Sequence, residues 1–115
     1  MNELIARLTA TAGLDEPTAR KAVGYVLNFL AKEGPAEPMA RLVAAMPGAS
    51  EVMAGVGPSG GGGIMGLGIE MMGAGISMGQ ITTVGRELFN AGREVVGEDT
   101  MGEIVGGVPG LSQFV

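Results

Sequence analysis

The chain of 115 residues contains no cysteine, no histidine and no tryptophan. Without cysteine it can form no disulfide framework, no thiol nucleophile and no zinc–thiolate site. Without histidine it lacks the usual general base near neutral pH and the commonest transition-metal ligand. We therefore expect no catalytic residue, no metal and no cofactor, and the chain is not expected to be an enzyme.

Aromatic residues make up only 3% of the chain, although hydrophobic residues make up 46%. Strands usually draw on β-branched and aromatic side chains. A core of Leu, Val, Ile, Met and Ala together with 22 glycines instead favours closely packed helices. The length is enough for one small domain with a single modest core. Composition therefore predicts an all-α domain.

Positive charge is scarce, and the net charge is −5. Residues 61–115 hold six acidic residues and only two basic ones, Arg86 and Arg93. Nucleic-acid binding normally requires clustered Lys and Arg, so we expect no nucleic-acid partner. The first residues lack a signal-peptide pattern, and the expected location is cytoplasmic.

Apolar residues in the first half recur at helical spacing. Leu4, Ile5 and Leu8 predict a first short helix. Asp15 is a candidate N-cap for a second helix that the Gly34-Pro35 pair ends. A third helix is expected from Pro38 to the Pro-Gly pair at 47–48.

The second half repeats this pattern at a distance of 62 residues. Asp15 corresponds to Ser77, and Pro47-Gly48 corresponds to Pro109-Gly110. Ser77 with Gln80, and Thr100 with Glu103, fit the capping-box pattern. We interpret the chain as an internally duplicated bundle of five or six short helices. Unit one spans 1–54, a Gly-rich connector 55–63 and unit two 64–115.

The stretch VGPSGGGGIMGLGIEMMG, residues 56–73, holds the densest glycine. Four glycines in a row favour a flexible joint, so the predicted hinge is Gly60, Gly61, Gly62 and Gly63. The next segment, 64–74, is predicted to be a buried helix. Its glycines at 66, 68 and 73 disfavour a helix, and we expect close packing against a neighbouring helix to offset that cost.

Two motifs that are associated with enzymes or cofactor binding occur in this stretch without the other residues and elements that they require. Residues 57–61 fit the G-x-S-x-G nucleophile turn, which needs a histidine partner. Residues 61–66 fit G-x-G-x-x-G, which needs a preceding strand and an acidic residue about twenty positions later. Between 54 and 79 the only charge is Glu70, but the many glycines argue against a membrane span.

Four of the nine methionines crowd into this region: Met65, Met71, Met72 and Met78. One interpretation is a core in which flexible thioethers fill gaps. The other is an adaptable apolar interaction surface formed by these methionines with Leu67. The favoured function is a binding or scaffolding module with a protein partner or self-association. The alternative is a carrier or sensor of a hydrophobic small molecule held between the two units.

The helix starts and stops of both halves resemble those of small bacterial helical domains of unknown function, including the YidB-like proteins. The resemblance rests on Gly13-Leu14-Asp15 with Gly75-Ile76-Ser77, and on Met46-Pro47-Gly48 with Val108-Pro109-Gly110. It implies an all-helical fold, and it brings no established activity or site residues.

Overall fold

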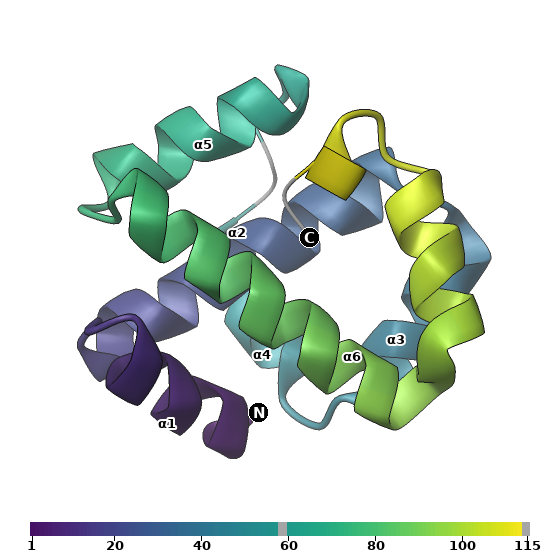
Figure 1. Cartoon of the computed structure of the whole chain (residues 1–115), viewed down its shortest axis with the longest axis horizontal. Helices are drawn as coiled ribbons and strands as arrows, with labels where there is room; N and C mark the ends of the chain where they lie inside the picture. The colour runs from purple at the N-terminus through teal and green to yellow at the C-terminus, as the bar shows by residue number, and fades with distance from the viewer. Residues whose placement is uncertain (58–59, 114–115) are drawn as a thin grey trace.

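Six α-helices and one short 3₁₀ helix account for the secondary structure in the computed structural model, which describes residues 1–57 and 60–113 (Figure 1). No strand occurs in these ranges, so the predicted all-α class is confirmed. The helices are α1 (Asn2–Thr11), α2 (Glu16–Glu33), α3 (Ala36–Ala45), α4 (Ala49–Ala54), α5 (Gly63–Gly73) and α6 (Met78–Gly106), followed by η1 (Leu111–Gln113).

Side-chain caps define where the two longest helices begin. Asp15 accepts a hydrogen bond from the backbone N–H of Thr18 at 2.8 Å and starts α2. Ser77 accepts one from the N–H of Gln80, whose side chain in turn accepts from the N–H of Ser77. These bonds satisfy backbone donors that a helix leaves unpaired at its first turn. Both predicted caps are therefore confirmed.

Helix α6 is not regular throughout. Gly97 has φ 85° and ψ 167°, which breaks the helix within its printed bounds. The predicted capping box at Thr100 and Glu103 is wrong. The break lies three residues earlier, Thr100 is buried, and Glu103 forms an ion pair with Arg41 of α3 instead.

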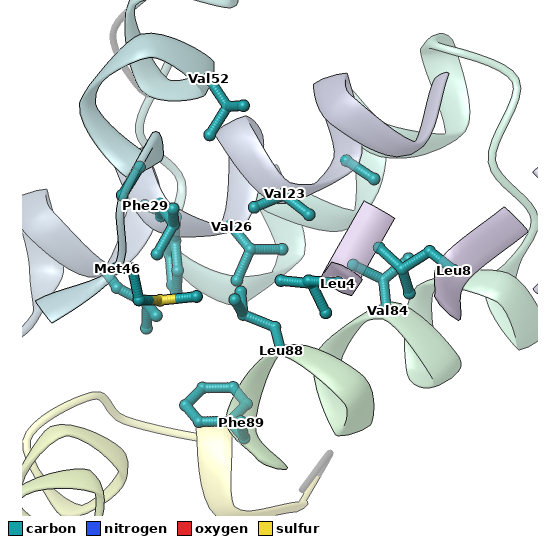
Figure 2. Packing of buried hydrophobic residues seen from close by; sticks show 14 of the residues in the cluster. Leu4, Leu8, Val23, Val26, Phe29, Met46, Val52, Val84, Leu88 and Phe89 are labelled. Carbon is teal, nitrogen blue, oxygen red and sulfur yellow. The ribbon is translucent and has the colours of Figure 1, made fainter. Parts of the chain in front are cut away.

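Helix α2 is the centre of the fold and contacts each of the other five α-helices. Its buried residues pack against α1, α4 and α6 within one hydrophobic cluster, part of which Figure 2 shows. Helices α1 and α3 from the first half also pack on α6 from the second half. The two predicted units thus share one core.

The order of the helices follows the 62-residue offset. Helix α1 corresponds to α5, and α2 corresponds to α6 as far as its break. Gly13 and Gly75, before the caps, have φ of 69° and 90°, and Gly48 and Gly110 have 89° and 82°. Positive φ favours glycine at each of these turns. The duplication itself stays a prediction.

Helix α5 differs from the predicted buried helix. Leu67 and Met71 face the core, whereas most of the opposite side of α5 is exposed. Gly66 does pack closely, but against the backbone of Gly61 and not against a helix. No atom lies near enough to contact a β-carbon at Gly68 or Gly73. None of the described helices is both long and apolar enough to cross a membrane.

Candidate functional site: an apolar groove between α5 and α6

The five residues of the predicted apolar surface all lie on α5 or at the first position of α6, and all five line one open cavity. They divide into two groups. Leu67 and Met71 form the floor, with exposed fractions of 6% and 0%. Met65, Met72 and Met78 lie at the rim, with exposed fractions of 74%, 46% and 59%. Met71 is therefore a core residue, as the first interpretation expects, whereas the interaction surface of the second interpretation stays a prediction.

The cavity, hereafter the groove, has a volume of about 160 Å³. Helix α5 forms one wall, α6 forms the other, and α2 and η1 supply one residue each. In Figure 1, α5 and the start of α6 diverge from the turn that joins them. The groove is lined by Val26, Ile64, Met65, Leu67, Gly68, Ile69, Met71, Met72, Met78, Ile81, Gly85, Phe89 and Leu111.

Sequence reasoning missed one prominent residue of this site. Ile69 is 65% exposed and lies between Met65 and Met72 in an i, i+4, i+7 pattern. That spacing places all three side chains on one face of a helix, so helical periodicity could have identified Ile69. We call Met65, Ile69, Met72 and Met78 the apolar patch.

The turn between α5 and α6 determines where the patch lies. Gly75, with φ 90°, reverses the chain after α5. Ile76 is 1% exposed and anchors the turn in the core. The capping box of Ser77 then starts α6 at the next residue. Met78 is thereby held at the rim of the groove, beside the other three residues of the apolar patch, which lie on α5.

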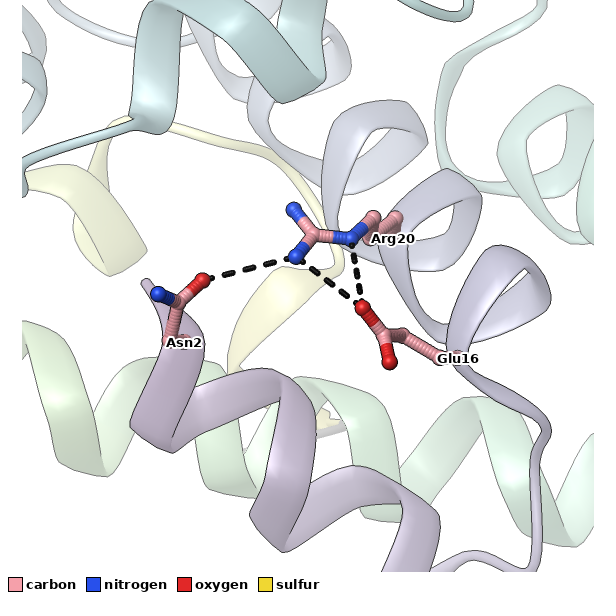
Figure 3. A network of polar contacts seen from close by, with 3 residues as sticks. All are labelled: Asn2, Glu16 and Arg20. Atoms are coloured by element: carbon pink, nitrogen blue, oxygen red, sulfur yellow. Dashed lines mark hydrogen bonds and ion pairs between the residues drawn. The ribbon is translucent and has the colours of Figure 1, made fainter.

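The corresponding place in the first half is polar. Positions 62 residues before Ile64, Met78 and Thr82 are Asn2, Glu16 and Arg20. The Arg20 guanidinium donates to Glu16 Oε1 at 3.2 Å and to Asn2 Oδ1 at 3.4 Å, which joins α1 to α2 (Figure 3). The equivalent positions in the second half carry no such network, and the groove lies open there.

The groove itself is electrically neutral, because none of its lining residues is titratable. The nearest charges in sequence are at its flanks. Glu70 of α5 accepts a long hydrogen bond, 3.5 Å, from the N–H of Gly60. Arg86 follows Gly85 of the groove wall, is exposed, and forms no hydrogen bond or ion pair with the described residues. Such a site can bind apolar surface but offers no group for acid–base chemistry.

No metal site is evident elsewhere in residues 1–57 and 60–113, where no three Asp or Glu side chains come close enough to share an ion. Two further hollows lie on the other side of α2. They are lined by mixed polar and apolar residues, among them Arg20 and Glu51 in both.

The predicted hinge, Gly60 to Gly63, lies between α4 and α5 and is held against α5. Gly61, Gly62 and Gly63 have φ of 87°, 83° and 62°. Gly61 packs so tightly on Gly66 that a β-carbon on Gly66 would clash with the Gly61 carbonyl oxygen. The hinge role stays a prediction, and residues 58 and 59 of the connector lie outside the described residues.

Comparisons of the chain with protein-family models, with curated proteins and with solved structures found no match. The resemblance to the YidB-like proteins therefore stays a prediction.

Proposed function

We propose that the chain is a non-enzymatic binding module that takes up apolar side chains of a protein partner in the groove. One observation carries the proposal. Five large hydrophobic side chains are exposed among the described residues, and four of them form the apolar patch around a single neutral cavity. The largest contiguous apolar patch on the surface of a monomer is often a functional one.

The first half of the chain supports this proposal, because it folds without such a patch. The residues 62 positions before Met65, Ile69, Met72 and Met78 are Glu3, Arg7, Ala10 and Glu16. Two of them form ion pairs within the chain, Arg7 with Glu87 and Glu16 with Arg20. A helix at this place thus does not need apolar residues on its outer face, which supports a binding role for those on α5.

The shape of the groove suits an amphipathic helix. Helix α5 has 11 residues, which is about 16 Å or three turns. A partner helix presents apolar residues at i, i+3, i+4 and i+7 over the same length. Methionine side chains adapt to different partners because they are flexible and polarizable. A cytoplasmic location remains part of the proposal.

The methionines offer a direct test. In protein with ¹³C-labelled methionine methyl groups, we would titrate a synthetic helix that carries leucine on one face. Signals of Met65, Met72 and Met78 should shift, whereas those of Met39 and Met101, buried elsewhere, should not. Ile69→Glu should abolish the shifts. Val95→Glu is the matched control, since Val95 is the fifth exposed hydrophobic and does not line the groove. Shifts spread evenly over all methionines, or none at all, would contradict the proposal.

A second candidate function is the uptake of a small hydrophobic molecule, favoured by the enclosed floor of the groove. A cavity of about 150 Å³ is known to hold a molecule the size of benzene, and this one is of similar volume. It lies largely in the second half, since Val26 is its one lining residue from the first. A bound apolar molecule should shift the signal of buried Met71 most, and native mass spectrometry of the purified protein should show the added mass.

A further inference from the structure

We propose that a second copy of this chain occupies the groove, so that two molecules pack their apolar patches together about a two-fold axis. This inference rests on the proposed function, because it names the partner of the same surface. It draws on three properties of the surface: its shape, its area and the charges at its two flanks.

The surface combines a ridge, formed by the exposed side chains of Met65 and Ile69, with a hollow, which is the groove. Met65 and Ile69 are the most exposed hydrophobic side chains among the described residues, and both border a cavity of about 160 Å³. That volume admits one or two large side chains. In a two-fold contact the same surface meets itself, so the ridge of each molecule can enter the hollow of the other.

The area of the patch suits a reversible dimer. The largest apolar patch on an ordinary monomer covers about 300–600 Å², and we take the four side chains of the apolar patch, which are 46% to 74% exposed, as a patch of that size. Two such patches in contact bury about 600–1,200 Å² in total, and the upper value reaches the lower limit of specific interfaces. We therefore expect dimer dissociation constants on the order of micromolar.

Opposite charges lie at the two flanks of the surface. Successive side chains along an α-helix point in directions that differ by about 100° around the helix axis. On α5, Gly68 lines the groove and Ile69 points outward, so Glu70 lies on the flank away from α6. On α6, Val84 is buried and Gly85 lines the groove, so Arg86 lies on the outer flank.

A two-fold axis that lies in the plane of contact and runs along the groove exchanges the two flanks. It brings Arg86 of one molecule towards Glu70 of the other, twice in each dimer. The surface between them is free of charge, so the net charge of −5 is not concentrated where the two molecules meet. Glu94 is eight residues from Arg86, which places it about 12 Å further along the same side of α6.

The experiment measures the mass of the full chain in solution over a range of concentrations by analytical ultracentrifugation. Wild type should show a monomer–dimer equilibrium. Ile69→Glu should leave only monomer, whereas Val95→Glu should dimerise as wild type does. Helical content by circular dichroism would verify that each variant is folded. A wild type that stays monomeric up to millimolar concentration, or equal effects of the two variants, would overturn the inference.

Charge reversal tests the orientation of the two molecules. Arg86→Glu and Glu70→Arg should each weaken the dimer by about tenfold, because two attractive pairs become repulsive. The double variant should return to within about threefold of wild type. Lys21→Glu, which makes the same change in charge at a residue of α2 that lines a different hollow, should have little effect. Failure of the double variant to recover would overturn the two-fold arrangement.

The outcomes also separate this inference from the proposed function. If wild type is monomeric but the leucine-faced helix still shifts Met65, Met72 and Met78, the groove binds another partner and only the second-copy inference is wrong. If the chain neither dimerises nor binds the helix or a small apolar molecule, both proposals are wrong.

Discussion

The side chain of Asn28 in α2 donates a hydrogen bond of 2.8 Å to the carbonyl oxygen of Met53 in α4. Its amide nitrogen also donates to the carbonyl oxygen of Gly57 in the connector. One partly buried amide thus ties the end of α4 and the start of the connector to the central helix. Buried carbonyl groups that lose their donor are costly because water cannot fully replace it.

We predict that Asn28→Ala lowers the free energy of unfolding by about 1–3 kcal/mol, since two carbonyl groups lose a donor. Urea denaturation followed by circular dichroism measures this change. The control is Asn90→Ala, at the position 62 residues later. Asn90 is exposed, and among residues 1–57 and 60–113 its side chain accepts a hydrogen bond only from Arg93 in its own helix. Its loss should therefore cost less than about 0.5 kcal/mol. Equal losses for the two variants would contradict the role of Asn28.

A matched pair of glycines in α5 should respond oppositely to alanine. A β-carbon on Gly66 would clash with the carbonyl oxygen of Gly61, whereas nothing lies within 4 Å of one on Gly68. Gly66→Ala should therefore destabilise the fold by about 1–3 kcal/mol, as overpacking does. Gly68→Ala should stabilise it by up to about 1 kcal/mol, because alanine favours the helix.

Thermal unfolding of both variants measures the difference. Both substitutions add the same methyl group to the same helix, so each controls for the other. If Gly66→Ala were as stable as wild type, the close contact between α5 and the connector would not exist in solution.

The sequence predicted those parts of the fold that depend on local chemistry. Asp15 and Ser77 were identified as caps because capping involves only the next three residues. The same reasoning failed at Thr100, where burial of the side chain and the backbone break at Gly97 prevail over a local pattern. Local patterns are reliable only where tertiary packing does not compete with them.

The candidate site was only partly predictable, for a related reason. The methionines of α5 were identified as a group, but Met71 is buried and Met65 is exposed. Periodicity separates the two faces of a helix, yet which face a neighbouring helix covers depends on contacts between distant residues. Here Val26 and Phe89 complete the floor of the groove, and no local signal links them to α5.

The cap of α2 should make stability depend on pH. Two hydrogen bonds with Thr18 lower the pKa of Asp15 below its usual value of 3.8. The bond with the Thr18 side chain has the larger effect, and the bond with its backbone N–H has the smaller one. A lowered carboxyl pKa means that the charged form stabilises the folded state above pH 3.8. This contribution is lost as the pH falls through the lower folded-state pKa.

We therefore predict that Asp15→Asn, which keeps a capping oxygen but removes the charge, is less stable than wild type at neutral pH. The difference should shrink to nothing below the folded-state pKa, as measured by urea denaturation over a series of pH values. Ser77→Ala is the control, because the serine cap does not titrate. It should cost about 0.5–2 kcal/mol, with no change over the same pH series. A constant difference for Asp15→Asn would show that its charge does not contribute.

The break in α6 depends on a backbone conformation that only glycine adopts readily. Gly97 has φ 85° and ψ 167°, a region that costs other residues about 1–3 kcal/mol. The change of direction lets the last part of α6 bury Met101 and Ile104 beside α3. Space is not the constraint, because nothing lies within 4 Å of a β-carbon at this position.

Gly97→Ala should therefore lower the free energy of unfolding by about 1–3 kcal/mol, measured by urea denaturation. Gly102→Ala is the matched control. Gly102 is exposed in the same helix, and a β-carbon there would also meet open space. Since its backbone is helical, alanine should stabilise the fold by up to about 1 kcal/mol. If Gly97→Ala were also stabilising, α6 would have to run straight through position 97, and Met101 and Ile104 could not keep their places in the core.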